Sequence, residues 1–109
     1  MPKELTEISD TTFEGEVLKC NTPVFVEFYN TGCGTCKMLE YILCEIAEKY
    51  NGRAKVVKIC VAGNNETIGK YSILGAPTLI LFKDGNIKGE FTGPQQKSEL
   101  AARLDEICD

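Results

Sequence analysis

The six-residue segment Val24–Tyr29 constrains the fold of this chain more than any other stretch. Its residues are strand formers and nearly all apolar, and Glu27 is the one charge among them. Such a run is typical of a β-strand that is covered on both faces, as in a sheet packed between helices. A Cys-Gly-Thr-Cys motif follows at residues 33–36, and apolar side chains then recur every three or four residues up to Tyr50. We therefore place the two thiols at a strand-to-helix junction.

The remaining sequence continues this alternation of strand and helix. Apolar runs predict strands, three-to-four spacing predicts helices, and Asp84-Gly85 between two strand-forming runs predicts a hairpin turn. Thr11 and Glu14 have the spacing of a capping box at the start of the first helix. The predicted order is a strand over 3–8, a helix over 11–19, a strand over 24–29, a helix over 34–50, a strand over 54–61, a short helix over 63–71, strands over 77–82 and 87–91, and a helix over 96–107.

This order predicts an α/β protein with a mixed five-stranded β-sheet flanked by four α-helices. The first half is a βαβαβ unit, whose strands are parallel and joined by right-handed crossovers. The second half, ββα, adds an antiparallel hairpin and a final helix. A length of 109 residues suffices for a hydrophobic core without disulfide staples, and no linker or repeat divides the chain. We expect residues 1–109 to form a single domain.

The distribution of charge excludes several classes of partner. The formal net charge is -4 and the lysines and arginines are scattered, so no basic surface for nucleic acid or anionic lipid is expected. Charged residues recur throughout the N-terminal part of the chain, which predicts neither a signal peptide nor a membrane span. We expect a cytoplasmic, monomeric protein.

The six cysteines point to a dithiol rather than to a disulfide framework. A framework requires an oxidising compartment and a core too small to be stable alone, and neither condition is expected here. We therefore expect Cys20, Cys44, Cys60 and Cys108 to be thiols. Cys44 and Cys60 are expected in or beside the core. Cys20 and Cys108 end helices, where regulatory oxidation or dimerisation is an alternative.

Two thiols at the Cys-x-x-Cys spacing either bind a metal ion or exchange a disulfide. The chain contains no histidine and no second close cysteine pair, so a four-ligand zinc site has too few ligands. Redox chemistry is therefore favoured. Cys33 falls at the start of the helix, where unpaired N–H groups and the helix dipole stabilise a thiolate, which makes it the nucleophile. Cys36 lies one turn further on and is expected to resolve a mixed disulfide.

Glu27 is a further candidate for catalytic chemistry. A carboxylate inside a buried strand is costly unless its pKa rises, and a raised pKa suits a general base. The alternative is a structural role, in which Glu27 reaches solvent or pairs with Lys58.

These residues lie in a context that resembles the thioredoxin family over residues 6–107. The matching segments are Val26-Glu27-Phe28, Lys37-Met38, Tyr71 with Ile73, Gly75-Ala76-Pro77-Thr78-Leu79, Phe82-Lys83-Asp84-Gly85 and Gly93. The resemblance implies a thioredoxin fold and a cis peptide bond before Pro77, which would lie against the active disulfide and dock the substrate backbone. It also implies that Glu27 relays a proton for Cys36 and that Lys58 tunes Glu27.

The chain departs from the family pattern at the rim around the two thiols. Tyr29 and Gly32 stand where tryptophan is usual, and Thr35 stands where proline is usual. We expect partner choice to differ, because Gly32 removes a flat apolar contact and loosens the backbone. Thr35 retains an N–H that proline lacks, which predicts a more oxidising potential than that of a Thr35→Pro variant. The expected docking rim comprises Tyr29, Gly32, Gly34, Thr35, Ala76 and Gly93.

The resemblance implies a thiol-disulfide oxidoreductase that reduces protein disulfides through Cys33 and Cys36 without a bound cofactor. Electrons would come from a dedicated reductase, either NADPH-linked or ferredoxin-linked, and pass to disulfide-containing client proteins. A glutathione-dependent, glutaredoxin-like enzyme is an alternative that the buried carboxylate and the chain length disfavour. A disulfide isomerase or oxidase is disfavoured because no export signal is expected, and a non-catalytic binding module would require Cys33 to be unreactive.

Overall fold

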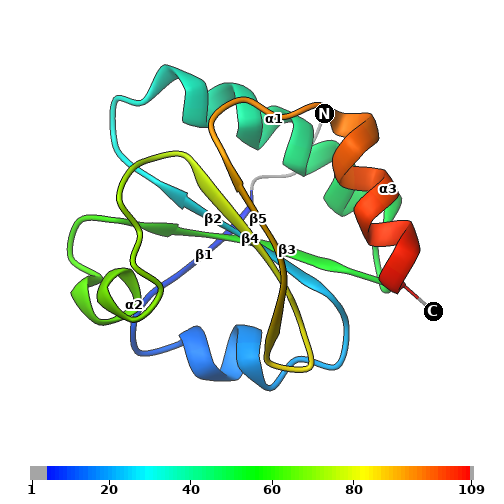
Figure 1. The fold of residues 1–109 in the computed structure, drawn as a ribbon, viewed down its shortest axis with the longest axis horizontal. Helices are drawn as coiled ribbons and strands as arrows, with labels where there is room; N and C mark the ends of the chain where they lie inside the picture. Colours follow the sequence, from blue (N-terminus) through cyan, green and yellow to red (C-terminus); the bar gives the residue numbers. More distant parts are fainter. Residues whose placement is uncertain (1–4, 109) are drawn as a thin grey trace.

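A computed structural model describes residues 5–108 and shows a five-stranded β-sheet between two layers of helix (Figure 1). Its elements are β1 (Thr6–Ile8), η1 (Glu14–Leu18), β2 (Val24–Tyr29), α1 (Gly34–Lys49), β3 (Lys55–Cys60), α2 (Asn65–Lys70), β4 (Thr78–Lys83), β5 (Asn86–Thr92) and α3 (Lys97–Ile107). The strand order is β1-β3-β2-β4-β5. β3 is parallel to β1 and β2, whereas β4 is antiparallel to β2 and β5. The predicted mixed sheet is thus confirmed.

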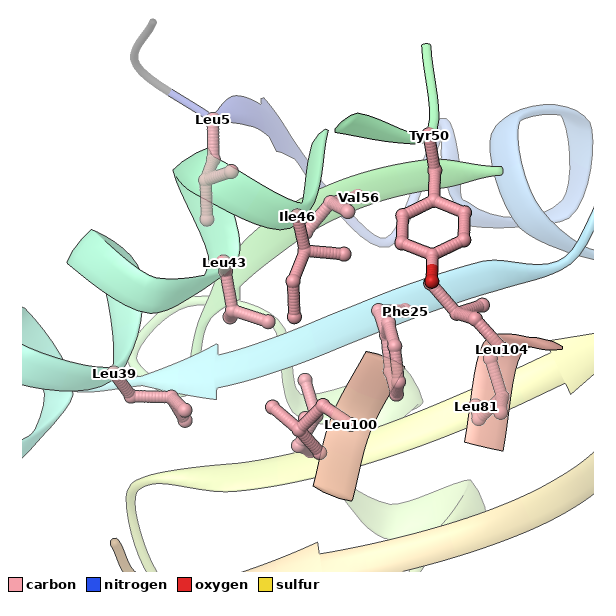
Figure 2. Packing of buried hydrophobic residues seen from close by; sticks show 11 residues of the cluster. Leu5, Phe25, Leu39, Leu43, Ile46, Tyr50, Val56, Leu81, Leu100 and Leu104 are labelled. Carbon is pink, nitrogen blue, oxygen red and sulfur yellow. The ribbon is translucent and has the colours of Figure 1, made fainter. Parts of the chain in front are cut away.

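Alternate residues of β2, β3 and β4 pack on opposite faces of the sheet and contribute to two hydrophobic cores. In the first core, Phe25 packs with Leu43 of α1 and Leu100 of α3 (Figure 2). In the second core, the neighbouring residue Val26 packs with Val17 of η1, and α2 borders the same cluster. The period of two along β2 therefore assigns its odd-numbered residues to the face that α1 covers.

The segment between β1 and β2 differs from its prediction. Instead of a helix over 11–19, a turn leads into the five-residue π-helix η1, whose N-cap residue Phe13 makes no side-chain capping bond. The predicted capping box of Thr11 and Glu14 is wrong, because the Ser9 backbone N–H donates to Thr12 Oγ1 at 2.9 Å instead. Burial of Phe13 in the second core fixes this segment more strongly than local helix propensity does. The four predicted helices are three α-helices and one π-helix.

The other elements begin and end within two residues of their predicted bounds, apart from the first strand. β1 begins at Thr6, and residues 3 and 4 of the predicted strand lie outside the described residues. The hairpin between β4 and β5 turns at Asp84 and Gly85, whose φ angles are +53° and +79°. Two consecutive residues with positive φ are the signature of a type I′ turn, and the predicted hairpin turn at these residues is confirmed.

Candidate functional site

Three segments meet at one edge of the sheet, where β2 ends (Figure 1). Phe28 pairs with Thr78 at the start of β4, and Thr78 pairs in turn with Thr92 at the end of β5. This antiparallel register brings together the loop after β2, the residues before β4 and the residues after β5. The Cys-x-x-Cys motif, Pro77 and Gly93 lie on these three segments. Residues far apart in the sequence therefore converge on one edge.

Cys33 and Cys36 form a disulfide at the start of α1, with their Cα atoms 5.2 Å apart. Cys33 is the N-cap residue of α1, and its Sγ accepts a hydrogen bond from the Cys36 backbone N–H at 3.1 Å. Cys36 is only 1% exposed, whereas Cys33 is half-buried. An external thiol or disulfide can therefore approach the sulfur of Cys33 more readily than that of Cys36. The helix N-terminus also favours a negative charge at Cys33.

Two of the predicted rim residues border one hollow together with Pro77. Ala76, Pro77 and Gly93 line a hollow of about 290 Å³. The peptide bond between Ala76 and Pro77 is cis. The Gly93 backbone N–H donates to the Pro77 carbonyl oxygen at 3.1 Å, which ties the two segments together. Leu74 also lines this hollow and is 98% exposed, so it offers an apolar contact there.

Thr35 borders a second hollow, of about 420 Å³, with Met38, Tyr41 and Pro94. Met38 and Tyr41 are large exposed side chains of α1. Gly93 lines the first hollow and the next residue, Pro94, lines the second, so the two hollows are neighbours. The disulfide motif is therefore continuous with a largely apolar surface, of the kind that contacts other proteins.

The remaining rim residues have different environments. Gly32 has a φ of +73°, a left-handed conformation that strains any other residue. Gly34 is the first residue of α1, and open space surrounds the position that a Cβ would take. Tyr29 belongs to a charged cluster, because its hydroxyl donates to Glu7 and Lys58 Nζ lies 4.9 Å from its ring centroid. Burial and the bond to Glu7 raise the pKa of Tyr29.

Glu27 is completely buried in β2, in line with the residues that face α1. Neither of its carboxylate oxygens has a hydrogen-bond partner among residues 5–108. Burial and the nearby Glu40 carboxylate raise the pKa of Glu27 to about 8, while the positive charge of Lys58 opposes this rise. A carboxyl group with such a pKa gains or loses a proton near neutral pH, as a general base requires.

Lys58 lies opposite Glu27 in the register of β3 and β2, but its ammonium group pairs with Glu40 of α1 at 3.2 Å. Burial lowers the pKa of Lys58, but the hydrogen bond and the charge of Glu40 outweigh burial and raise it. The alternative in which Glu27 reaches solvent or pairs with Lys58 does not describe this structure. Sequence reasoning missed Glu40, although it lies four residues after Cys36 on the helix face that meets the sheet.

The four cysteines outside the Cys-x-x-Cys motif are all partly shielded from solvent. Cys20 and Cys60 are thiols as predicted, and both are half-buried. Cys44 and Cys108 are half-buried too, and Cys108 Sγ donates to the Arg53 carbonyl oxygen at 3.6 Å. Within residues 5–108, no group of three or more Cys, Asp or Glu side chains is placed to hold a metal ion. No helix in this part of the chain is long and apolar enough to cross a membrane.

Comparison with known proteins identifies the family. A family model described as Thioredoxin matches residues 4–106. Thioredoxin of Pseudomonas aeruginosa is 43% identical over 105 residues, which cover 96% of this chain and 97% of that protein. Thioredoxin of Acidithiobacillus ferridurans is 42% identical over the same shares, and Thioredoxin 1 of Synechococcus elongatus is 39% identical over 90% of this chain and 92% of that protein. The chain therefore belongs to the thioredoxin family of dithiol-disulfide oxidoreductases.

Proposed function

We propose that this protein carries electrons from a reductase to client proteins, with Cys33 as the nucleophile and Cys36 as the resolving thiol. As a family, thioredoxins act on disulfide clients, are reduced by thioredoxin reductase and use a redox-active disulfide in place of a cofactor. The observation that carries the assignment of roles is the unequal exposure of the two cysteines at the start of α1. The more accessible sulfur, at the helix N-terminus, is the one that attacks a client.

The proposed reaction consists of two exchanges. The Cys33 thiolate attacks one sulfur of the client disulfide, forms a Cys33–client disulfide and releases the other client sulfur as a thiolate. Cys36 then loses its proton and attacks Cys33 Sγ, so the Cys33–client bond breaks and its electron pair leaves with the client sulfur. The client gains two electrons and, with two protons, becomes a dithiol. The disulfide between Cys33 and Cys36 forms at the same time.

Glu27 is the proposed acceptor of the Cys36 proton, and Lys58 is the proposed residue that tunes Glu27. Support comes from the burial of the Glu27 carboxyl group, which has no hydrogen-bond partner among residues 5–108 and a pKa near 8. A Glu27→Gln variant should resolve the mixed disulfide roughly 100-fold more slowly at pH 8, because general-base assistance is lost. Stopped-flow release of a client thiol measures this rate. A rate that stays the same across neutral pH would remove Glu27 from the mechanism.

The hollow beside the cis peptide bond is the proposed docking site for the client backbone. Pro77, Ala76 and Gly93 line it, and the antiparallel register brings their segments to the edge where α1 begins. The side chain of Leu74 extends this site with an apolar contact. Tyr29, Gly32, Gly34 and Thr35 are proposed to shape partner choice through the backbone and charge near the disulfide.

We also propose that residues 1–109 act as a single-domain monomer in the cytoplasm. The thiols of Cys20 and Cys60 fit a reducing compartment. The electron donor is proposed to be either an NADPH-linked flavoprotein or a ferredoxin-linked reductase. Supplying each reductase separately and following reduction of the Cys33–Cys36 disulfide distinguishes the two donors, and sedimentation of the reduced protein reports its oligomeric state.

Trapping of the mixed disulfide tests the proposed function. A Cys36→Ser variant should accumulate a disulfide between Cys33 and a client, whereas a variant that also carries Cys33→Ser should accumulate none. Mass spectrometry of the trapped species should identify both client proteins and a reductase. Recovery of glutathione alone would favour the glutaredoxin-like alternative. A Cys33 that reacts with no disulfide would favour a non-catalytic binding module.

A further inference from the structure

A row of charged residues crosses three strands beneath α1. In the register of the sheet, Lys58 of β3 lies between Glu7 of β1 and Glu27 of β2. Glu40 approaches the same lysine from α1. Three carboxylates therefore surround one ammonium group, and the structure shows which of them it binds.

The three carboxylates differ in their hydrogen bonds. Lys58 Nζ donates to Glu40 Oε1 at 3.2 Å. The Glu7 carboxylate accepts a hydrogen bond from the Tyr29 hydroxyl. Glu27, the most deeply buried of the three, has no hydrogen-bond partner among the described residues. The group that most needs a positive partner is thus the one that lacks it.

The ion pair of Lys58 and Glu40 is largely shielded from solvent. The side chains of Lys58 and Glu40 are 22% and 23% exposed, so water screens their interaction less than that of a surface pair. A lysine whose charge is balanced at short range attracts a second carboxylate weakly. Glu40 also brings its own negative charge towards Glu27, which disfavours the ionised form of Glu27, whereas the charge of Lys58 favours it.

Apart from Lys58, the elements packed around Glu27 within residues 5–108 supply no compensating charge. Its partner in β4 is the apolar residue Leu79, and its partner in β3 is Lys58 itself. On β2 the nearest ionisable group is Tyr29, which is bonded to Glu7. On α1, Glu40 and the buried Cys36 lie on the face that meets the sheet. Glu40 is therefore the group whose removal would most change the surroundings of Glu27.

We propose that Glu40 is a positioning residue that holds Lys58 away from Glu27 and thereby sets the pH at which Glu27 loses its proton. This inference rests on the proposed function, because its consequence for catalysis acts through Glu27 and Cys36. With Glu40 in place, Glu27 holds a proton at neutral pH, and its carboxylate becomes available to Cys36 only as the pH rises. Without Glu40, Lys58 is free to stabilise the Glu27 carboxylate, so that proton is lost at lower pH.

The test is a Glu40→Gln variant, which keeps the size of the side chain and removes its charge. The titration midpoint of Glu27, followed through its carboxyl carbon by NMR in the oxidised protein, should fall by about one pH unit. The pH profile of client-thiol release should move in the same direction by the same amount. The matched control is Glu45→Gln, which removes a charge from the same helix at a residue that pairs with Lys97 at 3.8 Å. The control should leave the Glu27 midpoint unchanged.

A second variant pair tests whether Glu40 acts through Lys58. In a Lys58→Met background no ammonium group remains to be redirected, so Glu40→Gln should lower the Glu27 midpoint by less than half of its effect in the wild-type background. Equal shifts in the two backgrounds would overturn the inference, as would an unchanged midpoint in the Glu40→Gln variant itself.

The two readouts separate this inference from the proposed function. A Glu27 midpoint that falls as expected supports the role of Glu40, because the titration requires no turnover. If the release rate then fails to follow that midpoint, the proposed role of Glu27 as a proton acceptor is wrong while the placement of Lys58 by Glu40 stands.

Discussion

The two faces of the sheet carry adjacent residues of the same strands and have opposite character. On the face that η1 and α2 cover, Val26 lies between Val57 of β3 and Ile80 of β4, so the central row is entirely apolar. One residue further along β2, Glu27 lies between Lys58 and Leu79 on the face that α1 covers. The apolar row stabilises the fold at any pH. The charged row is expected to make stability depend on pH, and it lies on the face that α1 covers.

The largest effect should come from giving the apolar row a charge. Val26 is completely buried, and the buried residues of the cluster in which it packs are aliphatic or phenylalanine side chains. A Val26→Asp variant should lose about 5 kcal/mol of unfolding free energy at pH 7, because burial of an unpaired carboxyl group and loss of packing both act against folding. Urea denaturation measures the loss. A loss of unfolding free energy below about 2 kcal/mol would mean that the apolar face accommodates a buried carboxyl group as well as the face that carries Glu27 does.

The second effect concerns the charged row and depends on pH. The pKa of Glu27 is about 8 in the folded protein, against 4.5 for an ordinary glutamate side chain, so between these pH values the folded state binds a proton that the unfolded chain lacks. The stabilising contribution of this proton is complete below about pH 4.5 and disappears as the pH rises through 8. The difference in unfolding free energy between a Glu27→Leu variant and the wild type should therefore shift in favour of the variant between pH 4.5 and pH 9. The expected shift is about 4 kcal/mol.

Unfolding curves of both proteins at several pH values provide the difference. Glu45→Gln serves as the control for a general loss of negative charge, and its stability should follow that of the wild type. Parallel curves for Glu27→Leu and the wild type would show that the charged row contributes no pH dependence.

A smaller effect on stability should appear beside the disulfide, where the chain enters α1. Gly32 has a positive φ, whereas Gly34 is the first residue of α1, and both have open space at the Cβ position. A Gly32→Ala variant should lose about 1 kcal/mol through backbone strain. Gly34→Ala is the matched control and should be neutral or slightly stabilising. Equal thermal shifts for the two variants would contradict the left-handed conformation of Gly32.

The smallest effect is expected from Thr35→Pro. In the disulfide form the Cys36 N–H already donates to Cys33 Sγ, and this donor is kept in the variant. Loss of the Thr35 N–H removes at most one further donor to the Cys33 thiolate, so the reduction potential should become more negative by about 15 mV or less, which corresponds to roughly 0.7 kcal/mol. Equilibration against a glutathione buffer measures it. An equal or more positive potential would show that the Thr35 N–H does not stabilise the thiolate.

Most of the fold could be predicted because local patterns and tertiary packing agree along most of the chain. The apolar run Val24–Tyr29 required a strand covered on both faces, and Asp84-Gly85 required a tight hairpin turn, whatever surrounded them. The segment after β1 could not be predicted in detail. There the burial of Phe13 against residues distant in sequence determines the backbone geometry. The capping box that the spacing of Thr11 and Glu14 predicts does not form.

The candidate site was predictable to the extent that single residues reveal their own environment. A charge within a buried strand marked Glu27, and a thiol at a helix start marked Cys33. The partner of Lys58 could not be predicted in the same way. The sequence offers several acidic residues, and only the packing of α1 on β3 brings Glu40 within 3.2 Å of the ammonium group. Contacts between separate elements depend on helix position and rotation, which no local pattern specifies.

The unequal exposure of Cys33 and Cys36 also has a kinetic consequence. Since the sulfur of Cys36 lies in the interior, the proposed function implies that donor and client both use the sulfur of Cys33, so that their complexes with this protein exclude each other. Each reaction with a donor or a client changes the redox state of the protein before the next partner binds. Steady-state rates measured against donor at several client concentrations should therefore give parallel lines in double-reciprocal plots, the pattern of a ping-pong mechanism.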